Sequence, residues 1–130
     1  MRLSLLLLLA IPIHAQVDLP AELAAIRKTE HSFTIGARGE QGFWQMTRAN
    51  VAHYGGCGYD EAMALMQDNA RALPRIGMPV NPYTLALAWC LGIPKLDARR
   101  ISPAAVRYAR SVREAYKAIC PRPSSARPQP

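Results

Sequence analysis

The segment TEHSFTIGARGEQGFWQM, residues 29–46, joins two stretches of helical pattern and places an acid at the start of the join. Leu19, Leu23, Ile26 and Glu30 stand at positions i, i+4, i+7 and i+11, which line one face of an α-helix. Because three of the four are apolar, the pattern predicts a packed face that ends in a carboxyl group. Burial favours the neutral carboxyl, so Glu30 would hold a proton to donate as a general acid. The alternative is a helix-end glutamate that reaches solvent.

The first residues have the pattern of a secretory signal peptide. A positive start at Met1-Arg2 precedes an apolar run over residues 3–13, and a small residue, Ala15, stands before Gln16. The run is too short to span a membrane. We therefore expect a signal peptide at 1–15, a single domain at 16–120 and a disordered Pro-rich tail at 121–130. This organisation predicts an exported protein that is periplasmic or extracellular after cleavage.

The 130-residue chain carries a formal net charge of +7, and the charge is unevenly spread. Residues 16–94 contain six Lys and Arg against seven Asp and Glu, whereas residues 95–130 contain nine against two. In an exported protein, this basic C-terminal third favours anionic envelope polymers or lipid head groups as partners, and it makes nucleic acid a poor one. A solvated basic helix without a partner explains the same charges.

The three cysteines are Cys57, Cys90 and Cys120, and any pairing leaves one thiol over. We predict a Cys57–Cys120 disulfide, because both stand at the ends of predicted elements, where the chain can adjust to disulfide geometry. Three free thiols are the alternative. Cys90 lies in the most apolar predicted helix, where we expect a buried thiol. No pair of cysteines or histidines has metal-ligand spacing, so neither a metal nor a cofactor is expected.

Apolar periodicity and end signals predict a mainly α fold of about five helices. The first helix begins at the Asp18 cap and runs to about Glu30. Residues 31–42 are expected to form an irregular loop or a small hairpin. The second helix begins between Phe43 and Thr47 and ends at the Gly55-Gly56 pair.

The last three predicted helices follow from proline, cap and apolar signals. The third is capped by Asp60 and ended by Pro74. The fourth opens at Asn81-Pro82 and is uncharged on every face over residues 83–91, which is typical of the buried centre of a bundle. The fifth opens at Ser102-Pro103, and its predicted buried stripe consists of Val106, Ala109, Val112, Tyr116 and Ile119.

Several motifs, taken in order, resemble the lysozyme-like superfamily, above all the bacterial lytic transglycosylase (soluble lytic murein transglycosylase-like) domains. Glu30-His31-Ser32 resembles the helix-end Glu-Ser of those domains. Gly36-Ala37-Arg38-Gly39 and Gly42-Phe43-Trp44-Gln45 resemble their Gly-Ala-x-Gly turn and Gly-x-x-Gln helix start. Ala88-Trp89-Cys90-Leu91-Gly92 takes the place of an Ala-Tyr-Asn-x-Gly segment, and Tyr108-Ala109-Arg110-Ser111-Val112 resembles a Tyr-x-x-x-Val helix. The resemblance covers residues 19–119 and implies a single lysozyme-like helical domain.

The resemblance implies an enzyme that cleaves the MurNAc-GlcNAc bond of peptidoglycan glycan strands, with Glu30 as general acid/base. In the transglycosylases the sugar's own 6-hydroxyl closes an anhydro ring, so one carboxylate serves both steps. A hydrolase would use a second carboxylate, for which Glu40 is the candidate, and a solvent-facing loop glutamate is its alternative. The remaining candidates are substrate-binding residues, namely Gln45, Tyr108, Ser32 and Trp89.

Two of these candidates have a second interpretation. Tyr108 either directs its hydroxyl toward Glu30 or is a core tyrosine, and Trp89 either packs in the core or lines a groove. The family's Tyr-Asn pair is Trp89-Cys90 here, and only residues 31–35 separate the acid from the turn. These departures favour a second function, a non-catalytic lysozyme-like module that binds cell-wall glycan or joins an envelope assembly. A third function is a basic surface binder acting through the last helix.

Overall fold

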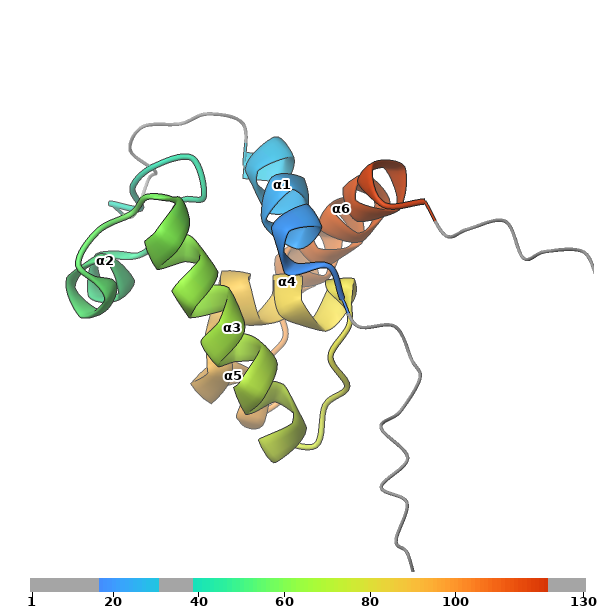
Figure 1. The fold of residues 1–130 in the computed structure, drawn as a ribbon. Helices are drawn as coiled ribbons and strands as arrows, with labels where there is room; N and C mark the ends of the chain where they lie inside the picture. Colours follow the sequence, from blue (N-terminus) through green and yellow to red (C-terminus); the bar gives the residue numbers. More distant parts are fainter. Residues whose placement is uncertain (1–16, 31–38, 122–130) are drawn as a thin grey trace, which may run out of the picture.

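The computed structural model describes residues 17–30 and 39–121. Within these residues the fold is mainly α, as predicted, and a single antiparallel bridge between Gln41 and Met46 is the one extended pairing. Six helices follow one another (Figure 1): α1 (Leu19–Glu30), α2 (Arg48–Tyr54), α3 (Tyr59–Arg75), α4 (Pro82–Leu91), α5 (Ile93–Asp97) and α6 (Pro103–Ile119). The predicted signal peptide, Ser32, residues 36–38 and the tail after Pro121 lie outside the described residues.

The uncharged helix α4 is the buried centre of the molecule, as its composition predicts. Asn81 and Thr84 form a capping box, in which each side chain accepts a hydrogen bond from the other residue's backbone N–H, at 2.9 and 3.0 Å. All residues from Thr84 to Trp89 are buried. Helices α3, α5 and α6 pack against α4, and α1 packs against α6 and α3. Figure 1 shows α4 crossing the middle of the helical assembly.

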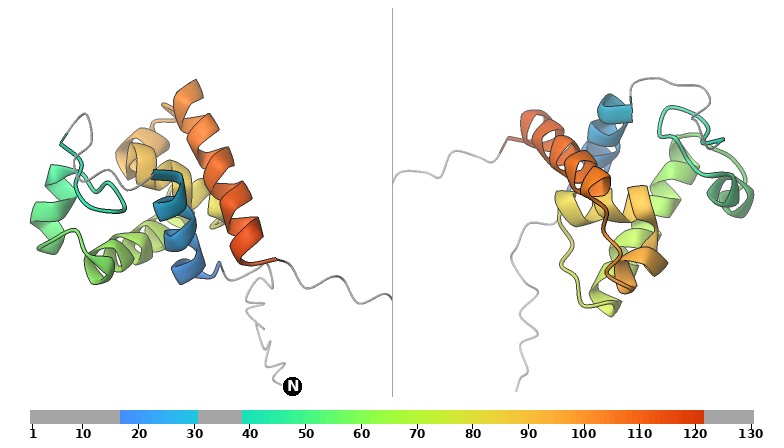
Figure 2. Two further views of the ribbon diagram at one scale, coloured as in Figure 1. Left: turned by 90° about the horizontal axis from the view of Figure 1, so that it is seen from above. Right: turned by 180° about the vertical axis from the view of Figure 1, so that it is seen from behind.

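Helices α1 and α6 lie side by side in every view (Figures 1 and 2). The Asp18 carboxylate caps α1, as predicted, by accepting a hydrogen bond from the Ala21 N–H at 3.0 Å. The Asp18 N–H in turn donates to the Tyr116 hydroxyl at 3.1 Å, which fastens the start of α1 to the end of α6. No helix of residues 17–30 and 39–121 is long and apolar enough to cross a membrane.

The second and third helices begin at positions other than those predicted. Thr47 caps α2 by accepting a hydrogen bond from the Asn50 N–H, so that helix starts at Arg48 rather than nearer Phe43. Residues 41–46 form a hairpin-like turn instead, because Gln41 and Met46 exchange two backbone hydrogen bonds of 2.9 Å. Helix α3 begins at Tyr59, so Asp60 is a first-turn residue that complements the helix dipole rather than the cap.

Two further expectations about helix ends need correction. The stop signal after α4 also starts the short helix α5, because Pro94 is compatible with a first helical turn. In α6 the fully buried residues are Ala105, Ala109 and Val112, whereas Ile119, predicted in the buried stripe, is 41% exposed. The last turn of α6 lies at the edge of the molecule (Figure 1).

The cysteine predictions are wrong in two respects. No disulfide joins any two of the three cysteines. Cys57 lies against Gly42 between α2 and α3, and Cys120 follows α6; Figure 1 places these two element ends on different sides of the molecule. Cys90 is exposed rather than buried, since it follows the buried stretch of α4 in the last turn of that helix.

Candidate functional site

Helix α1 carries two carboxyl groups with different surroundings. Glu30 is its last residue and is half-buried. Glu22, in the first turn, is 0% exposed, and neither of its carboxyl oxygens has a hydrogen-bond partner among the described residues. Burial raises the pKa of Glu22 to about 8, so this carboxyl is neutral at pH 7. Helix α1 thus holds a desolvated carboxyl at Glu22, a position that the sequence pattern did not single out.

Sequence reasoning missed Glu22, although a signal for it was present. Glu22 stands beside Leu23 and one turn before Ile26, two residues of the predicted packed face. In the structure, α6 and α3 pack on α1, and Glu22 is enclosed with Ala21 and Leu23. Because Glu22 has no exposed surface, it is too deep to contact a polymer outside the molecule, and its role is in the interior.

Tyr108 of α6 places its hydroxyl beside Glu30. Burial is the largest cause that raises the pKa of Tyr108 well above its usual value, and the charge of Glu30 and a hydrogen-bonding interaction with Glu30 come next. Cys90 and Glu22 add smaller contributions of the same sign. The hydroxyl oxygen is buried and has no partner at strict hydrogen-bond geometry in the described part of the chain. The structure therefore places Tyr108 of α6 near Glu30 of α1 and, with a smaller effect, near Cys90 of α4.

The two tryptophans connect the 41–46 turn to this group of helices. The Trp44 indole N–H donates to the Leu23 carbonyl of α1, and the Trp89 indole N–H donates to the Trp44 carbonyl, both at 2.9 Å. Trp89 is 9% exposed, so it packs in the core, and its one polar atom is occupied. Of the two interpretations of Trp89, the structure therefore shows the core residue rather than a groove residue.

Gln45 lies in the tight turn rather than at the start of a helix. Its φ of 50° is left-handed, and its side-chain amide donates to the Gly42 carbonyl at 2.9 Å, which stabilises that turn. Gly42 is required there, because its φ is 78° and a Cβ would meet the Cys57 carbonyl oxygen at 3.0 Å. Gln45 is half-buried and remains close to Trp44, which contacts α1.

Glu40, the candidate second carboxylate, directly precedes the Gln41–Met46 bridge and is half-buried. Among the described residues no group of three His, Cys, Asp or Glu side chains is placed to hold a metal ion. The chemistry available at the end of α1 is therefore that of a carboxyl group, a buried phenol and an exposed thiol. Comparisons with protein-family models, with curated proteins and with solved structures find no match for this chain.

Proposed function

We propose that the protein is an exported, lysozyme-like enzyme that cleaves the glycosidic bonds of peptidoglycan, with Glu30 as general acid/base. The observation that carries this proposal is the Tyr108 hydroxyl beside the half-buried Glu30 at the end of α1. A carboxyl that ends a helix next to a buried phenol can protonate a leaving oxygen and then have its negative charge stabilised by a nearby donor. The motif resemblance over residues 19–119 supports the same chemistry.

The proposed reaction uses a single carboxyl. Glu30 donates its proton to the glycosidic oxygen as the bond to the muramic acid carbon breaks. The Glu30 carboxylate then takes the proton of the sugar's 6-hydroxyl while that oxygen closes the anhydro ring, which restores the acid. Glu22 is fully buried and takes no direct part, and Glu40 has a role only if water replaces the 6-hydroxyl.

The alternative function is a non-catalytic module that binds cell-wall glycan or joins an envelope assembly. The observation that favours it is the state of the Trp89-Cys90 pair, which stands where the resembling enzymes have Tyr-Asn. Trp89 is in the core with its N–H bonded to the Trp44 carbonyl, and Cys90 is an exposed thiol, so this segment offers no phenol or amide to a sugar.

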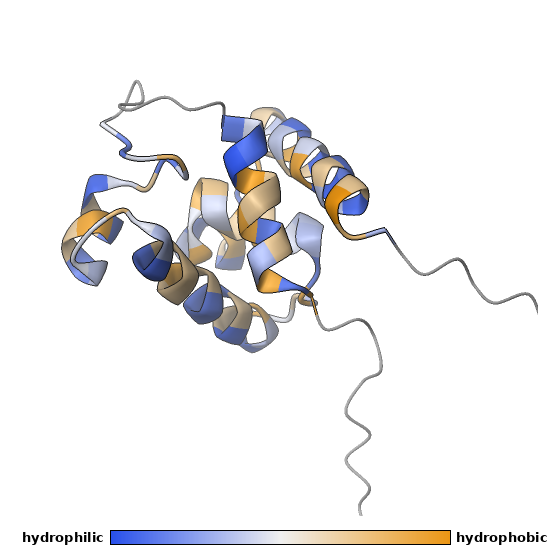
Figure 3. Cartoon of the chain, turned by 45° about the horizontal axis from the view of Figure 1, so that its top comes forward, coloured by the Kyte–Doolittle hydropathy of each residue, from blue (hydrophilic) through white to orange (hydrophobic). Residues whose placement is uncertain are grey.

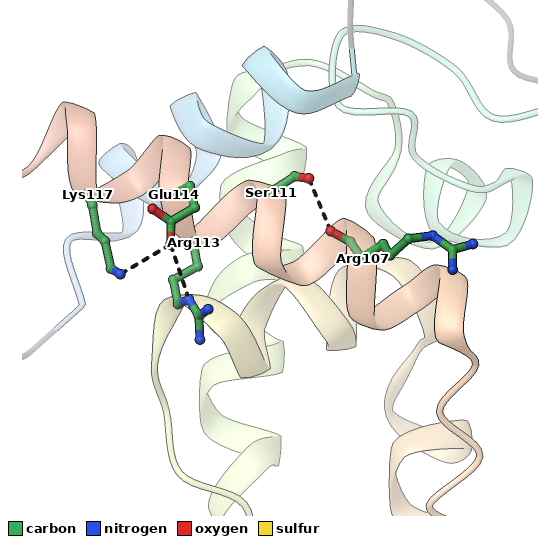
Figure 4. A network of polar contacts seen from close by, with 5 residues as sticks. All are labelled: Arg107, Ser111, Arg113, Glu114 and Lys117. Atoms are coloured by element: carbon green, nitrogen blue, oxygen red, sulfur yellow. Dashed lines mark hydrogen bonds and ion pairs between the residues drawn. The ribbon is translucent and has the colours of Figure 1, made fainter.

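The proposed envelope partner for α6 is an anionic surface. Coloured by hydropathy, α6 shows hydrophilic residues interleaved with hydrophobic ones (Figure 3). Glu114 forms ion pairs with Lys117 at 3.2 Å and Arg113 at 3.8 Å, and Figure 4 shows these contacts. Arg107 and Arg110 are exposed and form no ion pair with the rest of the described chain, which leaves their charges available.

Mass spectrometry of purified peptidoglycan after incubation with the protein tests the proposal. Anhydro-muropeptides in the soluble fraction would show transglycosylase chemistry, and reducing-end muropeptides would show hydrolysis. Intact glycan that sediments with bound protein would overturn the enzyme and establish the binding module. Glycan that is neither cut nor bound would overturn both functions.

A further inference from the structure

Two of the most exposed large apolar side chains lie together beside the 41–46 turn. Phe43 is 49% exposed and Tyr59 is 47% exposed, and the ring of Trp44 contacts both, with centroids 6.3 Å and 6.0 Å away. We call Phe43, Trp44 and Tyr59 the aromatic ledge. Trp44 itself is 6% exposed, so Phe43 and Tyr59 supply the exposed surface of the ledge. Exposed apolar surface marks binding sites, and aromatic rings suit the apolar faces of sugar rings.

A guanidinium group is held over this ledge. The central carbon of the Arg27 guanidinium lies 4.1 Å from the centroid of the Phe43 ring and 5.8 Å from that of Trp44. No ion pair or hydrogen bond joins Arg27 to another described residue. Stacking on Phe43 thus fixes the orientation of the group, and no described residue occupies its N–H donors or neutralises its charge.

The ledge is next to the proposed acid. Arg27 precedes Glu30 by three residues in α1, and side chains at i and i+3 of a helix are neighbours, with Cβ atoms about 5–6 Å apart. The Trp44 N–H bond to the Leu23 carbonyl fastens the ledge to the same helix. A polymer that contacts Phe43 and Arg27 therefore passes close to the end of α1.

We propose that Arg27 and the aromatic ledge form a subsite for a sugar ring that itself carries a carboxylate, namely a muramic acid unit with a free lactyl group. The ring lies against the ledge, and the guanidinium binds the carboxylate through two parallel N–H donors. This inference rests on the proposed function, since it assigns the substrate of that site.

The stacking of Arg27 on Phe43 indicates where the carboxylate of the bound sugar is attached. The guanidinium carbon is 4.1 Å from the Phe43 centroid, so an anion that it binds is held close to the ledge. This placement favours a carboxylate carried on the sugar ring itself over one that is several bonds away. In peptide-bearing glycan the lactyl group is an uncharged amide. The subsite is therefore specific for peptide-free stretches of the glycan strand.

Equilibrium binding to the Glu30→Gln protein tests the subsite without cutting the ligand. The probes are peptide-free glycan strands with free lactyl groups, peptide-bearing strands of the same length and uncharged chito-oligosaccharides. Tryptophan fluorescence reports binding, because the Trp44 ring contacts both exposed rings of the ledge, whereas the other tryptophan, Trp89, lies in the core. We expect peptide-free strands to bind about tenfold more tightly than the other two probes, as a charge-assisted hydrogen-bonded pair provides.

Substitutions then locate the effect. Arg27→Gln in the same background should remove the preference for peptide-free strands, and Phe43→Leu should weaken all three probes. Lys28→Gln is the matched control, because Lys28 is the next residue of α1, is also exposed and loses the same charge. Circular dichroism of each variant separates lost binding from lost folding.

Failure of this subsite and failure of the proposed enzyme give different results. Equal affinity for peptide-free strands and chito-oligosaccharides, or equal effects of Arg27→Gln and Lys28→Gln, would overturn the subsite whether or not the parent protein cuts glycan. An Arg27-dependent preference in a parent protein that cuts nothing would support the subsite and overturn the enzyme. A preference for peptide-bearing strands would also overturn the subsite, because it moves the recognised charge to the peptide.

Discussion

Helix α1 carries a glutamate near each end, and the two differ in how far they are buried. Glu22 in the first turn is fully enclosed, and its pKa is raised to about 8, whereas Glu30 in the last turn is half-buried beside Tyr108. Both are close enough to Tyr108 of α6 to raise its pKa, Glu30 more than Glu22. The difference shows that an apolar helical face does not by itself identify a catalytic acid. Such an acid also needs access to the substrate, and Glu30 alone retains exposed surface.

The largest expected effect is the loss of catalysis when Glu30, at the accessible end of α1, is replaced. Glu30→Gln preserves the shape of the side chain and removes its transferable proton, so glycan cleavage should fall by about a hundredfold or more while folding is preserved. The release of soluble muropeptides and thermal unfolding are the two measurements. Glu40→Gln is the control and should retain activity if the 6-hydroxyl attacks. Parental rates in Glu30→Gln would remove Glu30 from the mechanism.

The second effect is on stability at the enclosed end. The folded-state pKa of Glu22, about 8, exceeds the usual 4.5, so above about pH 4.5 the unfolded chain loses a proton that the native protein keeps. Stability must therefore fall as the pH rises toward 8. From this group alone the free energy of unfolding should fall by about 2–3 kcal/mol between about pH 5 and pH 7.

The amide of the Glu22→Gln variant is neutral at every pH. This variant should therefore lose the part of the pH dependence of the unfolding free energy that Glu22 causes. Urea unfolding at several pH values measures the difference between parent and variant. Asp97→Asn serves as the control, because Asp97 is exposed at the end of α5 and its replacement should leave the slope unchanged. Identical slopes for the parent and Glu22→Gln would mean that the carboxyl is ionised or hydrated in solution.

Local signals predicted the helices better than they predicted the environments of individual side chains. The start of α1 at Asp18 and of α4 at Asn81-Pro82 follows from cap chemistry within one turn of the chain, and both predictions are correct. The burial of Glu22 depends on how α6 and α3 approach α1, which no short pattern records. Apolar periodicity therefore predicted which face of α1 packs against the core, but not how deeply an individual side chain such as Glu22 is buried.

The candidate site was predicted in part for the same reason. The motifs left Tyr108 either beside Glu30 or in the core, and in the structure its hydroxyl is both buried and close to Glu30. The predicted roles of Gln45 and Trp89 assumed a helix start and an open groove. Residues 41–46 form a turn instead, and the Trp89 N–H bonds to the Trp44 carbonyl inside the core. Long-range contacts of this kind are decided by packing.

The third effect concerns the link between α6 and the accessible end of α1. Tyr108→Phe removes the hydroxyl beside Glu30, and we expect glycan cleavage to fall by about tenfold, as for the loss of one hydrogen-bonding donor near a charge. Stability should be unchanged or slightly higher, because the lost oxygen is buried without a partner at strict geometry. Full activity in Tyr108→Phe would assign Tyr108 to the core alone. Tyr83→Phe is the control, since Tyr83 lies at the start of α4 beneath Arg113.

The smallest effect lies on the outer face of α6, away from either carboxyl. Arg107 and Arg110 are exposed cations without an ion pair in residues 17–30 and 39–121, whereas Lys117 pairs with Glu114. If this face binds an anionic envelope surface, replacement of both arginines by Gln should weaken binding to sacculi about threefold to tenfold, because exposed charges each contribute little. Lys117→Gln should change binding less, since part of its charge is already neutralised by Glu114.

Salt gives an independent measure of the same contact. The screening length falls from about 10 Å at 0.1 M to about 3 Å at 1 M ionic strength, so binding through α6 should weaken steeply over this range. The variant with both arginines replaced should show a shallower dependence than the parent. Co-sedimentation with sacculi at graded salt, using the Glu30→Gln background to keep the glycan intact, provides both curves. Parallel curves for the two proteins would mean that α6 is solvated and binds no partner. Any salt dependence would then come from another part of the chain, and Arg27 over the aromatic ledge would be the first position to examine.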